Sequence, residues 1–212
     1  MERSFHSRNP VGALTGPLVA HSSVGRTIHR SPGESTIYLV NVIEDTCIYQ
    51  YGADTNYGSQ PYNRTAWATG HHWRALYKAN FAAYMGRTVE WAKFWWRNGG
   101  AADDVDVNLY GVLKNWGEMT CTWNKYDGVN VWATPGMGAG TDRDTLATST
   151  VHVTALAWYE MDVKALVQAW LGGSRSNYGH VVNVDYASSF LVDMEARNAP
   201  SGYYPYYQIA LF

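Results

Sequence analysis

The chain has little net charge, few cysteines and no long apolar run. Its 212 residues carry 16 Lys and Arg against 18 Asp and Glu, which gives a formal net charge of -2. A charge so close to neutral offers no electrostatic footprint for nucleic acid or for an anionic membrane surface. No apolar stretch approaches the length of a membrane span, and residues 1–26 carry Pro and Gly where a secretory signal would be apolar. We therefore expect no nucleic-acid partner, no membrane segment and no export through a usual signal.

The sequence also lacks the spacings that mark most catalytic and metal centres. The seven His show no H-x-H or H-E-x-x-H spacing, which argues against zinc. Residues 136–140 (GMGAG) lack the Lys and the following helix of a phosphate-binding loop, and no Ser lies in a nucleophile elbow. Cys47 and Cys121 make no metal-type spacing and are either buried free thiols or one disulfide between strands. We expect a protein that is not an enzyme and needs no cofactor, apart from the calcium hypothesis below.

Aromatic residues, by contrast, are unusually abundant. The chain has 10 Trp, 16 Tyr and 5 Phe, or 15% of all residues, alongside only 16% charged residues. Tyr and Trp supply large contact areas with a polar handle, which is typical of β-sandwiches and of proteins that form interfaces. The composition favours a protein that acts by contact.

One short helix is expected, at about residues 162–171. Asp162 can cap its start, and Gly172-Gly173 can end it with a left-handed residue. Its apolar residues recur with the helical period: Val163, Leu166, Val167, Trp170 and Leu171. Because a helix of about ten residues is marginal alone in water, we expect this stripe to pack on a sheet.

The rest of the chain divides into an extended N-terminal arm, residues 1–35, and an all-β domain, residues 36–212. The arm is rich in Gly, Pro, Ser, Arg and His, and it is either a disordered leader or a segment that becomes ordered on a partner. Neither face of residues 88–96 is wholly polar, so we expect cover on both sides, including from a neighbouring subunit. Runs of β-branched and aromatic residues predict strands at residues 36–40, 47–49, 66–69, 74–81, 88–96, 106–113, 151–159, 181–184, 190–194 and 206–211.

A series of short motifs runs through residues 36–212 in a fixed order. They are Asp45, DTNYG at 54–58, RAL at 74–76, VEWAKFW at 89–95, WGEMTCTWN at 116–124, WLGG at 170–173, NYG at 177–179, and Glu195-Ala196 ahead of Pro205. Together they resemble the DNRLRE family (disaggregatase-related repeat), which is similar to jelly-roll carbohydrate-binding modules. The resemblance implies a two-sheet antiparallel jelly-roll β-sandwich. The chain departs from the family at Ala79-Asn80, where members usually have a Phe-Asp pair.

Nine residues of these motifs are expected to form structural turns and a loop clamp. Trp116 and Trp123 are large enough to pin a loop against the edge of the sandwich, and Glu118 can accept backbone N–H bonds there. A catalytic role for Glu118 is disfavoured, because no partner acid is marked by spacing. The full set is Asn56, Tyr57, Gly58, Trp116, Glu118, Trp123, Asn177, Tyr178 and Gly179.

Two further sets could bind ligands. Hard oxygen ligands near strand ends could either hold a structural calcium, as related jelly rolls often do, or cap turns; they are Asp45, Asp54, Asn56 and Glu195. Aromatic residues in loops and near the C-terminus could either stack on sugar rings or pack in the core; they are Trp132, Tyr203, Tyr204 and Tyr206.

Two functions from different classes fit these features. The first is a structural protein of a bacteriophage virion, a head decoration or cement protein or a tail-associated protein. It would attach to capsid or tail proteins through residues 1–35 and the aromatic-rich sandwich, and it would form a homo-oligomer such as a trimer. The alternative, implied by the family resemblance, is a polysaccharide-binding module or adhesin that is secreted or lies at the cell surface.

Overall fold

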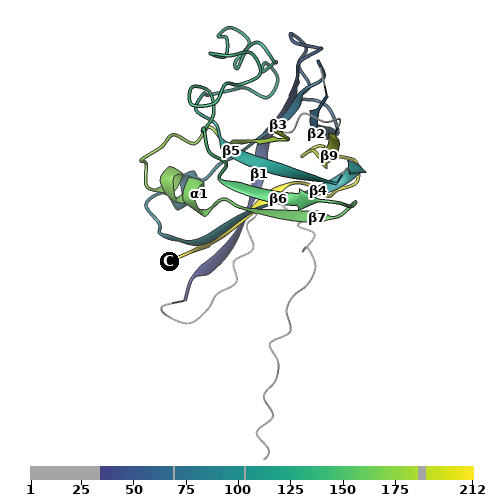
Figure 1. The fold of residues 1–212 in the computed structure, drawn as a ribbon. Helices are drawn as coiled ribbons and strands as arrows, with labels where there is room; N and C mark the ends of the chain where they lie inside the picture. The colour runs from purple at the N-terminus through teal and green to yellow at the C-terminus, as the bar shows by residue number, and fades with distance from the viewer. Residues whose placement is uncertain (1–33, 69, 103, 186–189) are drawn as a thin grey trace, which may run out of the picture.

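The computed structural model of the chain describes residues 34–68, 70–102, 104–185 and 190–212 (Figure 1). The arm expected at residues 1–35 therefore lies almost wholly outside the described residues. Strands dominate the rest, which confirms the all-β prediction. They are β1 (Thr36–Tyr49), β2 (Tyr62–Trp67), β3 (Trp73–Ala79), β4 (Val89–Ala102), β5 (Val105–Gly111), β6 (Ser149–Val153), β7 (Trp158–Asp162), β8 (His180–Asn183), β9 (Phe190–Glu195) and β10 (Tyr206–Leu211). The helical elements are a 3-10 turn η1 (Ala82–Tyr84) and α1 (Lys164–Leu171).

Six strands close into a ring, in the order β1, β10, β4, β9, β2, β3 and back to β1. Two long strands make closure possible because each pairs differently along its two halves. The first half of β1 pairs with β10 and the second half with β3, while β4 pairs first with β10 and β7 and then with β9. Strands β8, β5 and β6 extend the sheet beyond β3. All these pairings are antiparallel, and the two-sheet jelly roll remains a proposal.

Most strand boundaries differ from the sequence prediction; the run at 66–69 belongs to a strand at 62–67, for example, and the run at 88–96 continues to residue 102. In two places the number of strands differs as well. The runs at 36–40 and 47–49 are one strand, β1, because an irregularity between Val42 and Glu44 lets the chain change partner without leaving the sheet. The run at 151–159 is two strands, since β6 pairs with β5 and β7 pairs with β4. A continuous apolar pattern cannot show that its two ends join different partners.

The predicted helix is confirmed as α1. Its buried side chains are those of the predicted stripe, and Trp170 lies with its ring centre 5.7 Å from that of Phe81. Helical geometry begins two residues later than expected, with Val163 at the N-cap, although the Asp162 carboxylate still accepts the Lys164 N–H at 2.8 Å. None of the helices in the described part of the chain is long and apolar enough to span a membrane.

The core has two parts. The larger part fills the space between the strands and α1, and it includes the fully buried rings of Phe94, Trp96 and Tyr207. The smaller part lies under the long connection between β5 and β6, where Trp116, Trp123 and eight further buried residues pack on the other side of β3 and β8. The Gly-rich connection is therefore packed on β3 and β8. In Figure 1 its loops lie at the top of the molecule, beyond the strands of the ring.

Candidate functional site

The two Asn-Tyr-Gly motifs share one side-chain hydrogen bond, although only the second has its Gly in a left-handed conformation. In each, the Asn Oδ1 accepts the N–H of the Gly two residues later at 3.1 Å. The Nδ2 of Asn56 donates to the carbonyls of Glu118 and Cys121, both at 2.8 Å, and that of Asn177 donates to the Ala79 carbonyl at 2.7 Å. Each turn therefore ties its own segment to a distant one, because the Asn side chain satisfies backbone groups on both.

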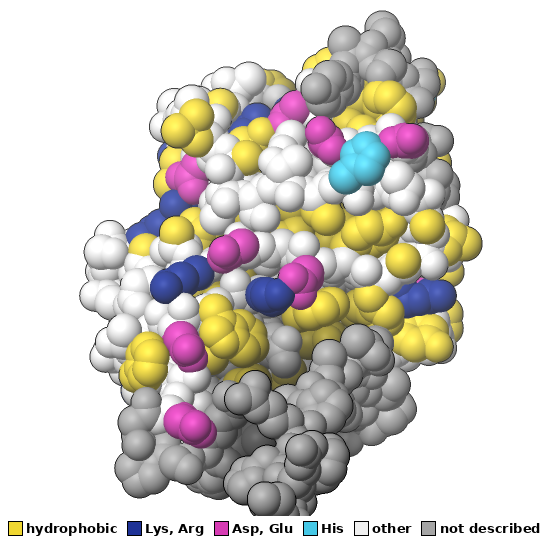
Figure 2. Space-filling model, turned by 60° about the horizontal axis from the view of Figure 1, so that its bottom comes forward, with side chains coloured by type: hydrophobic (Ala, Val, Ile, Leu, Met, Phe, Trp, Pro, Cys, Tyr) yellow, Lys and Arg dark blue, Asp and Glu magenta, His cyan; other side chains and the backbone are white. Residues whose placement is uncertain are grey.

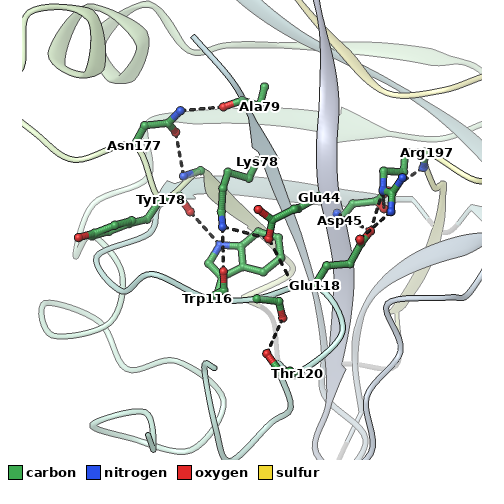
Figure 3. Close-up of polar contacts among 12 residues, drawn as sticks. Glu44, Asp45, Lys78, Ala79, Trp116, Glu118, Thr120, Asn177, Tyr178 and Arg197 are labelled. Atoms are coloured by element: carbon green, nitrogen blue, oxygen red, sulfur yellow. Dashed lines mark hydrogen bonds and ion pairs between the residues drawn. The ribbon is translucent and has the colours of Figure 1, made fainter. Parts of the chain in front are cut away.

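Trp116 joins the second of these turns to β3 (Figure 3). Its indole is buried, and Nε1 donates to the Tyr178 carbonyl at 2.8 Å. The Nζ of Lys78 donates to the Trp116 carbonyl at 2.8 Å, lies 4.6 Å from the centre of its ring and pairs with Glu44 at 3.1 Å. The ammonium on the ring face adds a cation–π contact to the hydrogen bonds. Trp123 is also buried, under the guanidinium of Arg74.

Glu118 takes part in a cluster of charged groups with Asp45 and Arg197, which we call the acid–arginine cluster (Figure 3). Arg197 donates to both oxygens of Glu118, at 2.7 and 2.6 Å, and its backbone N–H donates to Asp45 Oδ2 at 2.7 Å. Asn63 Nδ2 donates to the same oxygen at 2.9 Å, and Glu118 Oε1 accepts the Asp45 N–H at 3.2 Å. The cluster joins β1, the loop around residue 118 and the segment after β9.

Burial controls the protonation of Asp45. The side chain is almost fully buried, and loss of solvation raises its pKa from 3.8 to about 7. The Arg197 N–H bond opposes that rise and the nearby Glu118 charge adds to it. Because every carboxylate of the cluster is already bound to donors of the protein, the arrangement is that of a structural clasp.

The four residues of the calcium hypothesis do not converge, so that hypothesis is wrong for this set. Asp45 and Asn56 bind the donors given above, Asp54 accepts from Asn124 at 2.9 Å, and Glu195 pairs with Arg97 at 3.1 Å. Across the described ranges no group of three or more His, Cys, Asp or Glu could hold a metal ion.

The four aromatic residues that were candidates for stacking on sugar rings differ in their burial. Trp132 is 2% exposed and donates from Nε1 to the Thr122 carbonyl at 2.9 Å, so the prediction that it stacks on a ligand is wrong. Tyr203 and Tyr204 are 38% and 42% exposed, and Tyr206 is half-buried. The second core part buries Trp132, which a Gly- and Pro-rich sequence could not reveal.

Tyr203 and Tyr206 belong to a larger surface, the outer aromatic face, which they form with Trp95 and Trp158. The ring centres of Trp95 and Tyr206 lie 6.3 Å apart and nearly parallel, and Trp158 stands edge-on to Tyr203 and Tyr206 at 6.1 and 5.9 Å. The Arg97 guanidinium lies 4.4 Å from the centre of the Tyr203 ring. Figure 2 views the underside of Figure 1, where β7 lies, and shows hydrophobic side chains gathered between scattered charges.

The outer aromatic face follows from the alternation of β4. Trp96 points inward and is fully buried, whereas Trp95 points outward and is only partly covered. Within the described residues, the face of β4 that carries Trp96 is covered, as expected. The face that carries Trp95 is only partly covered, which differs from the expectation.

Sequence reasoning missed a second aromatic group, the β1–β3 ring cluster of Tyr49, Tyr51, Tyr57, His71 and Trp73. Tyr49 and Trp73 stack with ring centres 3.8 Å apart at 10°, and Tyr51 stacks on His71 at 5.3 Å. Tyr51 is 78% exposed. The signal available was the strand register, which sets Tyr49 opposite Trp73, but that register could not be read from either run alone.

Cys47 and Cys121 are both free and buried, which confirms the first of the two alternatives. Burial raises the pKa of Cys47 to about 12 and the pKa of Cys121 further still, so both remain thiols at neutral pH.

Comparison of the chain with protein-family models and with curated proteins finds no match. The resemblance to the DNRLRE family therefore rests on the motifs alone.

Proposed function

We propose that this chain is a non-enzymatic structural module of a bacteriophage virion, with a DNRLRE-like jelly-roll body. It decorates or cements the head or belongs to the tail. It is held there by residues 1–35 and by protein contacts of its aromatic surface, with capsid or tail proteins and further copies of itself as partners. A trimer is the proposed oligomer.

The observation that carries this proposal is the outer aromatic face. Tyr, Trp and Arg are the residues most enriched in the cores of protein interfaces, because they bury large areas at little conformational cost. Here Trp95, Trp158 and Tyr206 lie together on one sheet surface, with Arg97 over Tyr203 beside them. The clasp and turns described above hold loops in place, and the carboxylates of Asp45 and Glu118 are bound within them.

The oligomer can be tested by native mass spectrometry and light scattering of the full chain. We expect a trimer, and we expect Trp95→Ser with Trp158→Ser to give monomers, because loss of central aromatic anchors typically costs at least about 2 kcal/mol each. Tyr51→Ser, on the β1–β3 ring cluster, is the matched control and should leave the trimer intact. A wild-type chain that is monomeric at all concentrations would remove the support for assembly.

Assembly on a virion has its own test, in which phage particles lacking this chain are incubated with the purified protein and sedimented. We expect the full chain to sediment with the particles and a variant that begins at residue 36 to remain in solution. Failure of the full chain to bind heads or tails would contradict the virion assignment even if it forms a trimer.

The second candidate function is polysaccharide binding, and the β1–β3 ring cluster favours it. Exposed aromatic rings can stack on the apolar faces of sugar rings, and Tyr51 and His71 are both exposed. Affinity electrophoresis through gels that contain neutral or acidic polysaccharides would test it. We expect retardation that falls in Tyr51→Ala and His71→Ala but persists in Phe212→Ala, an exposed ring outside both sets. Equal mobility in all gels would leave the virion proposal as the sole one.

A further inference from the structure

Two arginine side chains, Arg74 and Arg143, are linked through Asn183 and Asp185 under the connection between β5 and β6. Arg143 is 9% exposed, and its guanidinium lies 3.9 Å from the centre of the Tyr110 ring. It pairs with Asp185, with 3.8 Å between Nη2 and Oδ1, and its Nη1 donates to the Asp144 carbonyl at 3.3 Å. In the part of the chain that the structure describes, its buried Nε has no hydrogen-bond partner. An unpaired N–H of a buried cation carries a large desolvation cost.

Arg74, on β3, makes hydrogen bonds to neutral acceptors. Its Nε donates to Asn183 Oδ1 at 3.3 Å, and its Nη1 donates to the Met137 carbonyl at 3.0 Å. The guanidinium lies 5.3 Å from the centre of the Trp123 ring. Burial lowers the pKa of Arg74 to about 10, and the neighbouring Arg143 charge acts in the same direction.

The acids around this pair are engaged elsewhere. Asp185 accepts from Tyr110 Oη and from the side-chain amides of Asn108 and Asn183. Asp142 accepts three backbone N–H groups, at 2.9 to 3.1 Å, and Asp144 pairs with Arg175 at 2.8 Å. The one carboxylate paired with Arg143 is therefore already bound by three neutral donors, and Arg74 reaches it only through Asn183.

We propose that Arg74 and Arg143 bind an oxyanion, the sulfate, phosphate or carboxylate group of a ligand, next to the buried Nε of Arg143. A guanidinium presents a planar set of N–H donors that matches two oxygens of such a group. An oxyanion there would give the Arg143 Nε an acceptor and would reduce the repulsion between the two cations. The site lies on the opposite side of β3 from the main core and goes beyond the proposed structural role.

Isothermal titration of the full chain with sodium sulfate, sodium phosphate and sodium glucuronate, each against sodium chloride at equal ionic strength, tests the site. Saturable binding of at least one oxyanion is expected, and the three salts distinguish a sulfate, a phosphate or a sugar carboxylate as the group preferred. Arg143→Gln and Arg74→Gln should each weaken binding by roughly tenfold or more, because each removes a charge-assisted hydrogen bond. Arg64→Gln, whose guanidinium is fully paired with Asp193, should bind as the wild type does.

One further variant and one crystallographic measurement test the site even if an arginine variant fails to fold. Asp185→Asn removes the competing carboxylate and should tighten binding, which a purely structural pair would not do. Wild-type crystals soaked in selenate should show an anomalous peak within hydrogen-bond distance of both guanidiniums. Binding that is unchanged in Arg143→Gln, or a soaked crystal without that peak, would overturn the proposal.

Discussion

At pH 8, Asp45→Asn will be more stable than the wild type by about 2–4 kcal/mol, and the difference will disappear near pH 4. The pKa of Asp45 is raised from 3.8 in the unfolded chain to about 7 in the fold. A raised pKa means that the folded state binds the proton more tightly, so this group stabilises the fold below pH 3.8. That contribution is lost as the pH rises to 7. An Asn cannot ionise, and its Oδ1 can still accept the bonds from Arg197 and Asn63.

The quantity to measure is the difference in free energy of unfolding between Asp45→Asn and the wild type. The reason is that His180 makes the stability depend on pH in the direction opposite to Asp45. His180 is fully buried, and its Nδ1 lies 2.8 Å from the Tyr207 hydroxyl. Burial lowers its pKa to about 3, so its contribution to stability is present above pH 6.5 and is lost as the pH falls towards 3. Between pH 4 and 6.5 the two groups nearly cancel in the wild type. Asp45→Asn should unmask a rise of about 1.4 kcal/mol per pH unit over that interval.

Urea denaturation at half-unit steps from pH 4 to 8 gives these curves. Asp54→Asn is the matched control, since its carboxylate is exposed and accepts a hydrogen bond from the neutral side chain of Asn124. It should stay within about 0.5 kcal/mol of the wild type at every pH. An Asp45→Asn protein that is less stable than the wild type at pH 8 would show that the charged carboxylate, held by Arg197, stabilises the clasp.

The sequence predicts best those elements that are determined by residues close together in the chain. The α1 stripe was readable because four buried residues repeat with the helical period and Gly172-Gly173 follows them. Strand β10 has the predicted bounds, 206–211, since its inward residues alternate and Pro205 precedes it. For Asp45, by contrast, the sequence predicts a turn cap or a calcium ligand. Its main donor is the backbone of Arg197, 152 residues away, and no local pattern carries that information.

Burial of loop residues was the second thing the sequence could not show. Trp132 lies in a stretch rich in Gly and Pro, where an exposed ring is a reasonable expectation. It is buried because the stretch folds back over Leu76 and Val181, on the outer side of β3 and β8. The same packing brings Arg143 to Arg74 across 69 positions of sequence, so the proposed oxyanion site was equally invisible.

The second large effect is expected from Gly179→Ala, which should lower the free energy of unfolding by about 3–5 kcal/mol. Gly179 has φ 74°, a left-handed conformation that costs a residue with a Cβ about 1–2 kcal/mol. A Cβ here would lie 2.0 Å from the Tyr77 carbonyl oxygen and 3.0 Å from Lys78 Cα, both on β3. Because those are backbone atoms within a paired strand, the turn must move away. Its movement would break the bond from Trp116 Nε1 to Tyr178.

Substitutions at two other glycines distinguish backbone strain from steric clash as causes of the lost stability. Gly173 has φ 71° and open space around its Cβ position, so Gly173→Ala should cost only the backbone strain, about 1–2 kcal/mol. Gly58 holds the same place in the first Asn-Tyr-Gly turn without a left-handed φ, and a Cβ there would lie 2.3 Å from the Glu118 carbonyl oxygen. Gly58→Ala should therefore report the clash alone. Chemical denaturation could instead show that Gly173→Ala lowers the free energy of unfolding as much as Gly179→Ala does. Backbone strain alone would then explain the need for glycine at 179, and the close approach of the second turn to β3 would not hold the loop around Trp116.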